Sequence, residues 1–508
     1  MLDGYSTDRS ILKIRPKAVA VPRTTSDIRK LVRFSNQLAL KKFKLPVTVR
    51  GSGLDKTGAA IGSGLIISME EMNSIQEVDP RQRLVRLQVG VTLGALKEAL
   101  SLHGLTLPVA GDNCETIGGL LANNYRGALA KKYGNISSRI SQAEIVLSSG
   151  DVIQTEHLKA RNLSKKKGLS GFEGEFYRRL DNFLSDNTAA FEDIDKNSRT
   201  GYAGISKIKT KNGTLDLLPA FFGSQGTLGI ITEVILSCEL ATDLPQYFVT
   251  SFTTANAALG FIIRAARLHP SEINVYDANL FHEALKTGKK FRPIKTLPEN
   301  GMIVSVTFDD SRRRHRSRKL KKLIAVLNKS TRFVTSNDKN YPEFIELQSV
   351  LSTYLNNPPR KIRAPLADDA FIPSDQLKRY FSGIVELEQK HGISLPIFGS
   401  ALTGNYSVRP EIDLSVVAGR QFALAFLREY NNLVTSCGGS LTGGSPEGRT
   451  KAIFVNANLS PKIRELYEEL KDIFDPNHIL NPDVKQGANL RSVVRSLRTS
   501  YTPGIIKK

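Results

Sequence analysis

Residues 50–59 read RGSGLDKTGA, and two further segments of the chain share this glycine-rich composition. Residues 116–127 read TIGGLLANNYRG, and residues 223–233 read GSQGTLGIITE. Because glycine and other small residues let backbone N–H groups approach an anion, successive amides in such turns form concave donor sites. We therefore expect a diphosphate to bind here, while any one segment alone is also compatible with a tight turn. Residues 50–59 match neither a Walker loop nor the GxGxxG dinucleotide fingerprint.

The sequence around these segments alternates short strands and helices. Strand patterns occur at 46–49, 65–67 and 84–89. One helix is predicted to begin at Thr92, another to be capped by Ser26 or Asp27, and a third to follow Ser460, with Pro461 in its first turn. No internal repeat of about 20 to 50 residues recurs. We expect an α+β or α/β body rather than a repeat architecture.

The composition is that of a globular protein with an unusually high charge. The 508 residues contain 71 Lys plus Arg and 49 Asp plus Glu, which gives a formal net charge of +22. At about 150 residues per domain, this length suggests about three structural units. No apolar run reaches the ~18 residues of a membrane span, and residues 1–16 lack the apolar core of a signal peptide. We therefore expect neither an integral membrane protein nor a secreted one.

The three cysteines, Cys114, Cys238 and Cys437, are widely spaced and form no metal-ligand cluster in the sequence. An odd number of cysteines cannot pair off completely. This usage is typical of reduced thiols, and we expect a cytoplasmic protein.

A basic run at residues 312–322 (RRRHRSRKLKK) leads into Leu323 and Leu327 at helical spacing. This pattern favours a surface helix whose basic face is solvated. Nucleic acid is not expected as a partner, because no recognised binding module accompanies the run and aromatic residues do not alternate with the basic ones.

The C-terminal tail is basic as well. Arg491, Arg495 and Arg498 recur at i, i+4 and i+7, with apolar residues on the other side of the same predicted helix. Such a helix could contact an anionic membrane peripherally, at the inner face, or it could dock on its own protein. The sequence leaves both alternatives open.

Taken in order, the motifs resemble those of a known family. A strand followed by RGSGLDKTGA, then Pro108, TIGGLLANN, Tyr133-Gly134 and GSQGTLGIITEV is similar to the FAD-binding domain of the vanillyl-alcohol oxidase and p-cresol methylhydroxylase (PCMH) superfamily. Residues 223–229 closely follow that family's GSEGTLG signature. Residues 474–482 (FDPNHILNP) resemble the C-terminus of the branch that contains D-lactate and glycolate dehydrogenases. The resemblance covers 14–240 well and 395–490 moderately.

The resemblance implies an α+β fold in four parts. A PCMH-type FAD-binding domain of two subdomains would span 14–240, and an α+β cap domain with an antiparallel sheet, which binds substrate, would span 241–460. A C-terminal segment at 461–487 would return to the FAD domain, and a basic tail would follow at 488–508.

The resemblance also implies where FAD binds. The pyrophosphate loop would contain Arg50, Gly51, Ser52, Gly53, Leu54, Asp55 and Gly58. The ribityl and diphosphate region would contain Thr116, Gly118, Gly119, Asn123, Asn124 and Gly127, and Pro108 would also bind the cofactor. The adenine side would contain Gly226, Gly229, Ile230 and Ile231. Asn481 would bring the C-terminus back to the flavin domain.

We expect FAD to be held without a covalent bond. Family members that bind flavin covalently through this loop place a histidine where Leu54 stands, and leucine cannot form that bond. Cys114 aligns with a cysteine that some relatives attach to flavin. Since its histidine partner is missing here, we expect Cys114 to be a small buried thiol.

The chain departs from the family at the residues that hold a divalent metal in the lactate and glycolate branch. A HxGDGNxH segment reads SALTGNYS here, so that Ser400 and Ser407 stand at the histidine positions, and Gly444 and Ser445 replace a glutamate and a histidine. Because serine hydroxyls alone are poor ligands for such an ion, we expect no metal site. The arginine that grips the substrate carboxylate would fall near Gln348.

Asn405 and Arg449 keep the family's identities, and we predict that they contact the substrate. Arg363 or Arg409 would replace the missing carboxylate contact, since a guanidinium suits bidentate binding. For each of these arginines, a surface or interdomain ion pair is the alternative.

These features predict an FAD-dependent oxidoreductase, a dehydrogenase rather than an oxidase. It would transfer hydride from a small hydroxylated, anionic substrate to FAD and pass electrons to a quinone or a carrier protein. The alternative is a flavin-binding subunit without turnover of its own, because residues that define catalysis in the relatives are replaced. An aldonolactone-oxidase-like enzyme is disfavoured, because that branch uses a C-terminal HWxK segment and this chain has no Trp.

Overall fold

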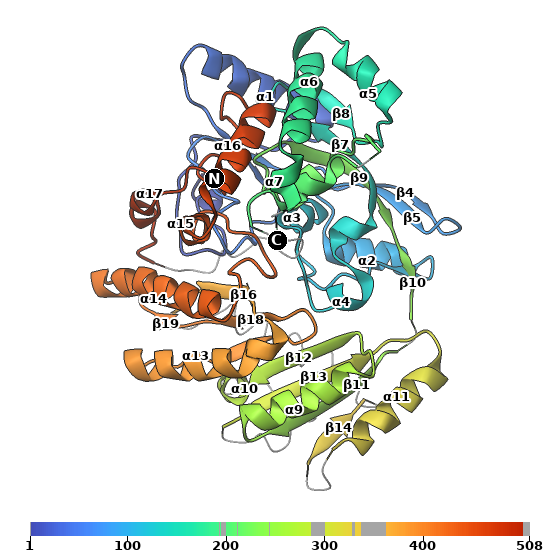
Figure 1. Cartoon of the computed structure of the whole chain (residues 1–508), viewed down its shortest axis with the longest axis vertical. Helices are drawn as coiled ribbons and strands as arrows, with labels where there is room; N and C mark the ends of the chain where they lie inside the picture. The colour runs from blue at the N-terminus through green and yellow to red at the C-terminus, as the bar shows by residue number, and fades with distance from the viewer. Residues whose placement is uncertain are drawn as a thin grey trace. The chain divides into compact units, whose positions relative to one another are not determined.

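The computed structural model describes residues 2–500 except 193, 195–199, 211, 243, 286–299, 328–330 and 337–361. The chain forms two compact units (Figure 1). The first contains Met1–Tyr125, Asn135–Leu240 and Ser445–Arg498, and the second is built mainly from Arg126–Gly134 and Ala241–Gly444. The second unit therefore ends at 444, earlier than the expected 460, because the chain from Ser445 onward is bonded into the first unit.

The first unit contains two sheets. Parallel strands in the order β1–β3–β2 form the smaller one: β1 (Ala18–Ala20), β3 (Leu65–Ser68) and β2 (Val47–Arg50). Antiparallel strands form the larger one in the order β4 (Ile75–Asp79), β5 (Leu84–Gln88), β9 (Ile230–Ser237), β7 (Ile140–Val146) and β8 (Val152–Gln154). Side chains along β9 alternate between buried and half-buried, as expected for a strand with one face on the core. A short antiparallel pair, β6 (Leu105–Thr106) and β10 (Glu239–Leu240), lies outside both sheets.

Several helices of the first unit begin at a polar residue whose side chain caps the helix. In α1 (Thr25–Leu40) the cap is Thr24, not the predicted Ser26 or Asp27. Thr24 accepts from the Asp27 N–H while the Asp27 carboxylate accepts from Thr24, which makes a reciprocal capping box. Thr92 caps α2 (Leu93–Ser101), and Ser460 caps α16 (Pro461–Phe474), both as predicted. The remaining helices are α3 (Ile117–Asn123), α5 (Ala160–Lys167), α6 (Gly171–Asp186), α7 (Thr188–Glu192), α8 (Leu218–Phe221), α15 (Ala452–Ala457) and α17 (Leu490–Arg495).

The C-terminal segment returns to the first unit, as the resemblance implied. The Phe474 ring lies 4.9 Å from that of Phe176 on α6, centroid to centroid. Beyond α16 the chain runs along β2, where the Val47 N–H donates to the Ile479 carbonyl and the Asn481 N–H donates to the Val47 carbonyl. These bonds bring Asn481 to the strand that leads into residues 50–59.

The described part of the tail docks on its own protein, which is one of the two alternatives left open above. Its helix α17 ends at Arg495, so Arg498 lies outside it. Arg498 is 2% exposed, and its guanidinium donates to the carbonyls of Leu12 and Asp8. A buried arginine bonded in this way cannot contact a membrane. Residues 501–508 lie outside the described part of the chain.

The second unit is built on a seven-stranded sheet, and its paired strands are antiparallel, as expected for the cap domain. The order is β14 (Phe333–Thr335), β11 (Gln246–Phe252), β13 (Met302–Phe308), β12 (Glu272–Asp277), β17 (Ile397–Ser400), β18 (Asn405–Val408) and β16 (Ala367–Phe371). A separate pair joins β15 (Ile362–Arg363) to β19 (Glu411–Ile412). The helices are α4 (Ala130–Tyr133), α9 (Ala255–Ala266), α10 (Ala278–Leu285), α11 (Arg313–Ala325), α13 (Leu377–His391) and α14 (Val417–Ser436).

Helices cover one face of this sheet, where α9 packs on β11 and β13 (Figure 1). The basic run forms α11, as predicted. Leu323 is buried and Arg313, Arg314 and Arg318 are exposed, but Arg316 of the same run is buried. Among the residues that the structure describes, no helix combines the length and the apolar character needed to cross a membrane.

Candidate functional site

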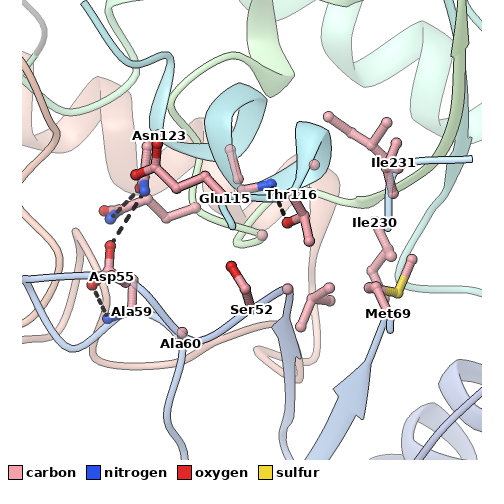
Figure 2. A pocket seen from close by; sticks show the side chains of 18 of the residues that line it. Ser52, Asp55, Ala59, Ala60, Met69, Glu115, Thr116, Asn123, Ile230 and Ile231 are labelled. Atoms are coloured by element: carbon pink, nitrogen blue, oxygen red, sulfur yellow. Dashed lines mark hydrogen bonds between the residues drawn. The ribbon is translucent and has the colours of Figure 1, made fainter. Parts of the chain in front are cut away.

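A cavity with about 880 Å³ of space, part of it open to solvent, lies in the first unit. Its two ends differ in character (Figure 2). Asp55 and Asn123 lie at one end, Met69, Ile230 and Ile231 lie at the other, and Ser52 points into the space between them. The cavity can therefore receive polar groups at one end and an apolar ring at the other, a combination typical of cofactor sites.

All three glycine-rich segments line this one cavity. Of the nineteen residues predicted to bind FAD, thirteen are among its lining residues: Gly51, Ser52, Gly53, Leu54, Asp55, Thr116, Gly118, Gly119, Asn123, Gly226, Gly229, Ile230 and Ile231. The other six, Arg50, Gly58, Pro108, Asn124, Gly127 and Asn481, do not line it.

The side chains of Arg50 and Asn481 do not line the cavity but hydrogen-bond to backbone carbonyls of the surrounding chain. The Arg50 Nη1 donates to the carbonyls of Thr7 (2.9 Å) and Ala60 (3.3 Å). The Asn481 Nδ2 donates to the carbonyls of Ala59 (2.9 Å) and Gln225 (2.8 Å). Both side chains therefore fix the backbone of the lining segments rather than the ligand.

The remaining four predicted residues are Asn124, Gly58, Pro108 and Gly127, and none of them lines the cavity. Asn124 ends α3 with a left-handed φ of 44°. Gly58 has φ of 83°, and a Cβ there would lie 2.8 Å from Leu12. Pro108 is buried after β6, and Gly127 belongs to the second unit.

Asp55 shapes its own loop. Its Oδ1 accepts hydrogen bonds from the Thr57 N–H (2.8 Å), the Thr57 hydroxyl (2.9 Å) and the Ala59 N–H (2.9 Å). The carboxylate folds the segment into a turn, which is the usual local role of aspartate in loops. It thus positions backbone amides and does not need to meet an anion itself.

Gln225 links the three segments to the C-terminal chain, and sequence reasoning missed it. Its Oε1 accepts from the Gly448 N–H (2.9 Å), and its Nε2 donates to Asn123 Oδ1 (3.1 Å) and to the Thr57 hydroxyl (3.3 Å). It is 4% exposed and has φ of 53°, a conformation that costs free energy for a side chain other than glycine. Its place inside GSQGTLG was the available signal.

The other lining residues that were not predicted come from strands, helices and the loops between them: Val49, Ala59, Ala60, Met69, Val89, Glu115, Ala122, Phe221 and Ser224. Most are apolar, and their sequence patterns are those of ordinary core positions.

Glu115 is an acid inside this cavity. Burial raises the pKa of its carboxyl to about 7, while Lys56 lowers it and Asp112 raises it through their charges. The Asp112 N–H donates to its Oε2 at 2.9 Å. Near neutral pH this carboxyl therefore exchanges between its neutral and its charged form.

We expect the affinity for FAD to fall as pH rises through about 7. Below that pH Glu115 is neutral, and above it a negative charge shares the cavity with an anionic diphosphate. Titration of the apoprotein with FAD at several pH values, followed by flavin fluorescence, measures this. In Glu115→Gln the step should be absent, and a step of the same size in that variant would show that another group causes it.

Asn405 lies in the second unit, at the start of β18. Its Nδ2 donates to the Arg126 carbonyl at 2.8 Å, which fixes the amide, and its Oδ1 is buried without a hydrogen-bond partner among the described residues. Ser400 pairs with Asn405 across strands β17 and β18. Its Oγ is also buried without a hydrogen-bond partner among the described residues. Cross-strand partners share one face of the sheet. Tyr406, the next residue, faces the other way and packs against Tyr380 of α13.

Arg449 lies in the first unit, and its guanidinium donates to the carbonyls of Gly58 (3.0 Å), Ile61 (3.1 Å) and Pro482 (2.6 Å). This geometry favours a structural role over the predicted substrate contact. In the second unit, Arg409 forms a buried two-bond pair with Asp368, which is the ion-pair alternative.

Arg363 is 6% exposed, donates to the Arg409 carbonyl at 3.2 Å and lies 4.0 Å from the Glu411 carboxylate, so it too forms the ion pair that was the alternative. Gln348 lies outside the described residues. Cys114 was expected to be buried, but it is exposed, because it lies in a surface turn after Asp112. It does not line the cavity.

Within the described ranges, no three side chains of His, Cys, Asp or Glu gather closely enough to hold a metal ion. The Ser407 hydroxyl accepts a hydrogen bond from the Asp369 N–H at 2.8 Å, so this hydroxyl is bonded to the backbone.

Comparison with known proteins identifies the family. Residues 16–156 match the model of an FAD binding domain, and residues 246–484 match that of the C-terminal domain of FAD linked oxidases. The chain belongs to the FAD-linked oxidases. FAD is therefore its cofactor, and the cavity bordered by the three glycine-rich segments is the place where the described residues fit it.

Relatives of this FAD-linked oxidase include the D-2-hydroxyglutarate dehydrogenase of Escherichia coli, which is 26% identical over 94% of this chain and 49% of that protein. The D-lactate dehydrogenase of Archaeoglobus fulgidus is 23% identical over 94% of this chain and 95% of its own. The chain thus spans about half the length of the D-2-hydroxyglutarate dehydrogenases that it matches.

Among solved structures, a 4-ethylphenol oxidase from Gulosibacter chungangensis in complex with isoeugenol superposes with a TM-score of 0.67. It is 16% identical and covers 96% of this chain and 92% of that one. This likeness concerns the fold.

Two of the glycines that line the cavity are packed closely against neighbouring residues. A Cβ at Gly118 would lie 3.0 Å from the Cβ of Val89, and one at Gly229 would lie 2.8 Å from the Phe221 ring. Glycine at these positions lets the lining backbones approach these neighbours. Leu54 would make only van der Waals contact with a flavin.

Proposed function

We propose that the protein is an FAD-dependent dehydrogenase that oxidises a small hydroxy acid. The observation that carries the proposal is the single cavity built from three glycine-rich segments, in a chain whose relatives are named dehydrogenases of D-2-hydroxyglutarate and D-lactate. Bound FAD would supply the acceptor for a hydride from the substrate carbon, and the hydroxyl proton would pass to solvent water. The protein's part is to hold the hydroxyl and the carboxylate in place.

Asn405 and Ser400 are the residues proposed to hold the hydroxyl. The fixed Asn405 amide presents a buried acceptor, Oδ1, that needs a donor, and an unmet buried acceptor costs about 1–3 kcal/mol. A substrate hydroxyl supplies that donor, and the Ser400 Oγ can bond to the same oxygen. Arg363 remains the residue proposed to contact the carboxylate.

The reaction is proposed to need no metal. The residues that hold a divalent ion in the resembling branch are replaced here by Ser400, Ser407, Gly444 and Ser445. Neutral hydrogen-bonding groups would bind the hydroxyl instead of a cation.

Anaerobic mixing of the purified protein with D-lactate, glycolate or D-2-hydroxyglutarate is expected to bleach the flavin absorbance, and the rate should survive treatment with a chelator. L-lactate serves as the mirror-image control. Bleaching that stops after chelation and returns with a divalent ion would contradict the metal-free proposal. If the flavin stays oxidised after mixing with each of the three acids, that result would contradict the proposed activity on hydroxy acids of this class.

A second candidate is a flavin-binding subunit that turns over only with a partner. One relative is named glycolate oxidase subunit GlcD, from Bacillus subtilis, at 23% identity over 92% of this chain. Bleaching by a hydroxy acid only after a partner protein is added would favour this candidate.

The electron acceptor is proposed to be a quinone or a carrier protein, and the protein is proposed to be cytoplasmic with peripheral contact to the inner face of an anionic membrane. The net charge of +22 supports attraction to such a surface.

A further inference from the structure

Two large apolar side chains stand exposed at the C-terminal end of α1. Leu40 is 69% exposed and Phe43 is 66% exposed. They belong to residues 38–44 (LALKKFK), which we call the α1 tip, and Lys41, Lys42 and Lys44 of this segment are exposed as well. Among the described residues, no carboxylate pairs with these three lysines. The tip therefore presents apolar and cationic groups together.

The backbone holds the tip in a defined conformation. The Lys42 N–H donates to the Ala39 carbonyl (2.8 Å), and the Phe43 N–H donates to the Leu38 carbonyl (2.9 Å). This pair of bonds ends a helix through a residue in the left-handed region, a position that glycine usually fills, and here Lys42 has φ of 65°. The residue after it commonly packs on the last turn of the helix. Phe43 stays two-thirds exposed instead.

Folding accounts for the lysines but not for the apolar side chains. Cations at the end of a helix interact favourably with its dipole, so the lysines stabilise α1. Exposed leucine and phenylalanine side chains add little to the stability of the folded chain. α11 offers a contrast, because its Arg313, Arg314 and Arg318 are exposed but its Leu323 is buried, so that these arginines present charge without an exposed leucine beside them.

An anionic membrane surface fits the combination of groups at the tip. Lysines are attracted to anionic headgroups, and side chains such as Leu and Phe enter the boundary between headgroups and acyl chains. We propose that the α1 tip docks the protein on an anionic membrane, with Leu40 and Phe43 inserted and the lysines at the headgroups. This inference rests on the proposed membrane contact and is independent of the proposed chemistry.

A single tryptophan tests insertion directly, because the chain has none. In the flavin-loaded Phe43→Trp variant, vesicles of phosphatidylcholine with phosphatidylglycerol should shift the emission to shorter wavelength and shield it from an aqueous quencher. The matched control is Leu102→Trp, at the end of α2, where the native residue is 86% exposed and no lysine adjoins it in sequence. Its emission should not change. If the Phe43→Trp variant binds vesicles while its tryptophan emission stays the same, the side chain at position 43 does not insert into the membrane, and the proposal is overturned.

The charge contribution is tested by sedimentation with the same vesicles. The triple variant Lys41→Gln, Lys42→Gln, Lys44→Gln should bind at least about tenfold more weakly, since each basic residue near an anionic surface adds to binding. The matched control removes the same charge from α11 through Arg318→Gln, Lys321→Gln and Lys322→Gln, and should bind nearly as the unchanged protein does. High salt should weaken binding, because the screening length falls to about 3 Å at 1 M.

An equal or larger loss in the α11 variant would overturn the proposal, as would an unchanged protein that does not sediment with these vesicles. Flavin bleaching by hydroxy acids is measured separately on each variant in the absence of vesicles. A protein that binds vesicles through the tip but is not reduced by hydroxy acids would refute the proposed reaction and leave this inference standing.

Discussion

Alanine in place of Gly51 is expected to lower the affinity for FAD about tenfold or more. A Cβ at this position would lie 2.1 Å from Oγ1 of Thr116. Thr116 cannot easily move, because its hydroxyl caps α3 by accepting from the Gly119 N–H at 3.2 Å and its side chain is branched at Cβ. Overpacking of this kind costs about 1–3 kcal/mol, and about 1.4 kcal/mol is a factor of ten in affinity. Both residues line the cavity, so the strain falls on the FAD site.

The measurement is the FAD content of the purified variant and the dissociation constant of FAD from the apoprotein. Adding Thr116→Ala removes the clashing hydroxyl, and the double variant should recover part of the affinity while losing a helix cap worth about 1 kcal/mol. Gly260→Ala is the control, since a Cβ there in α9 would lie 3.7 Å from the nearest atom. If Gly51→Ala binds FAD as tightly as the unchanged protein, the cavity of the first unit does not hold the cofactor.

Replacing Lys485 by methionine is expected to destabilise the first unit by about 3–5 kcal/mol. Lys485 and Glu447 form an ion pair at 3.0 Å in which neither side chain is exposed, and the second Glu447 oxygen accepts from the Gly201 N–H at 2.7 Å. Burial lowers the pKa of Lys485, and the charge of Glu447 raises it. Without its partner, Glu447 would be an uncompensated buried charge, which accounts for the expected size of the effect.

Urea unfolding followed by circular dichroism measures the loss. The double variant Lys485→Met, Glu447→Gln should be clearly more stable than Lys485→Met alone, because it no longer buries an unpaired charge. Lys390→Met breaks the exposed pair with Glu429 and should cost less than about 1 kcal/mol. A cost for Lys485→Met as small as that of Lys390→Met would show that the buried pair does not hold the C-terminal segment in place.

The sequence predicted the parts of the site that depend on local backbone chemistry. Segments rich in small residues at 50–59, 116–127 and 223–233 were expected to expose their amides, and all three line the cavity. The apolar wall of the cavity could not be found in this way. Val49 lies in a strand, and Met69 and Val89 directly follow one, so their sequence patterns are ordinary and their meeting depends on how the sheets pack.

Roles that depend on distant partners were harder to predict. Arg449 lies in a motif of the family, but its hydrogen bonds go to backbone carbonyls of residues far away in the sequence, which no residue pattern reveals. Arg498 continued a helical periodicity, yet it is buried against Leu12, 486 positions earlier. At the start of α1 several adjacent residues can act as caps, and only the reciprocal bond with Asp27 distinguishes Thr24.

The most direct test of the account is the visible absorption spectrum of the purified protein before and after denaturation and precipitation. We predict a yellow protein that releases one FAD per chain into the supernatant, because Leu54 lines the cavity and Cys114 does not. Colour that remains in the pellet would contradict noncovalent binding. A colourless protein whose apo form takes up no added FAD would contradict the claim that the three glycine-rich segments form a flavin site.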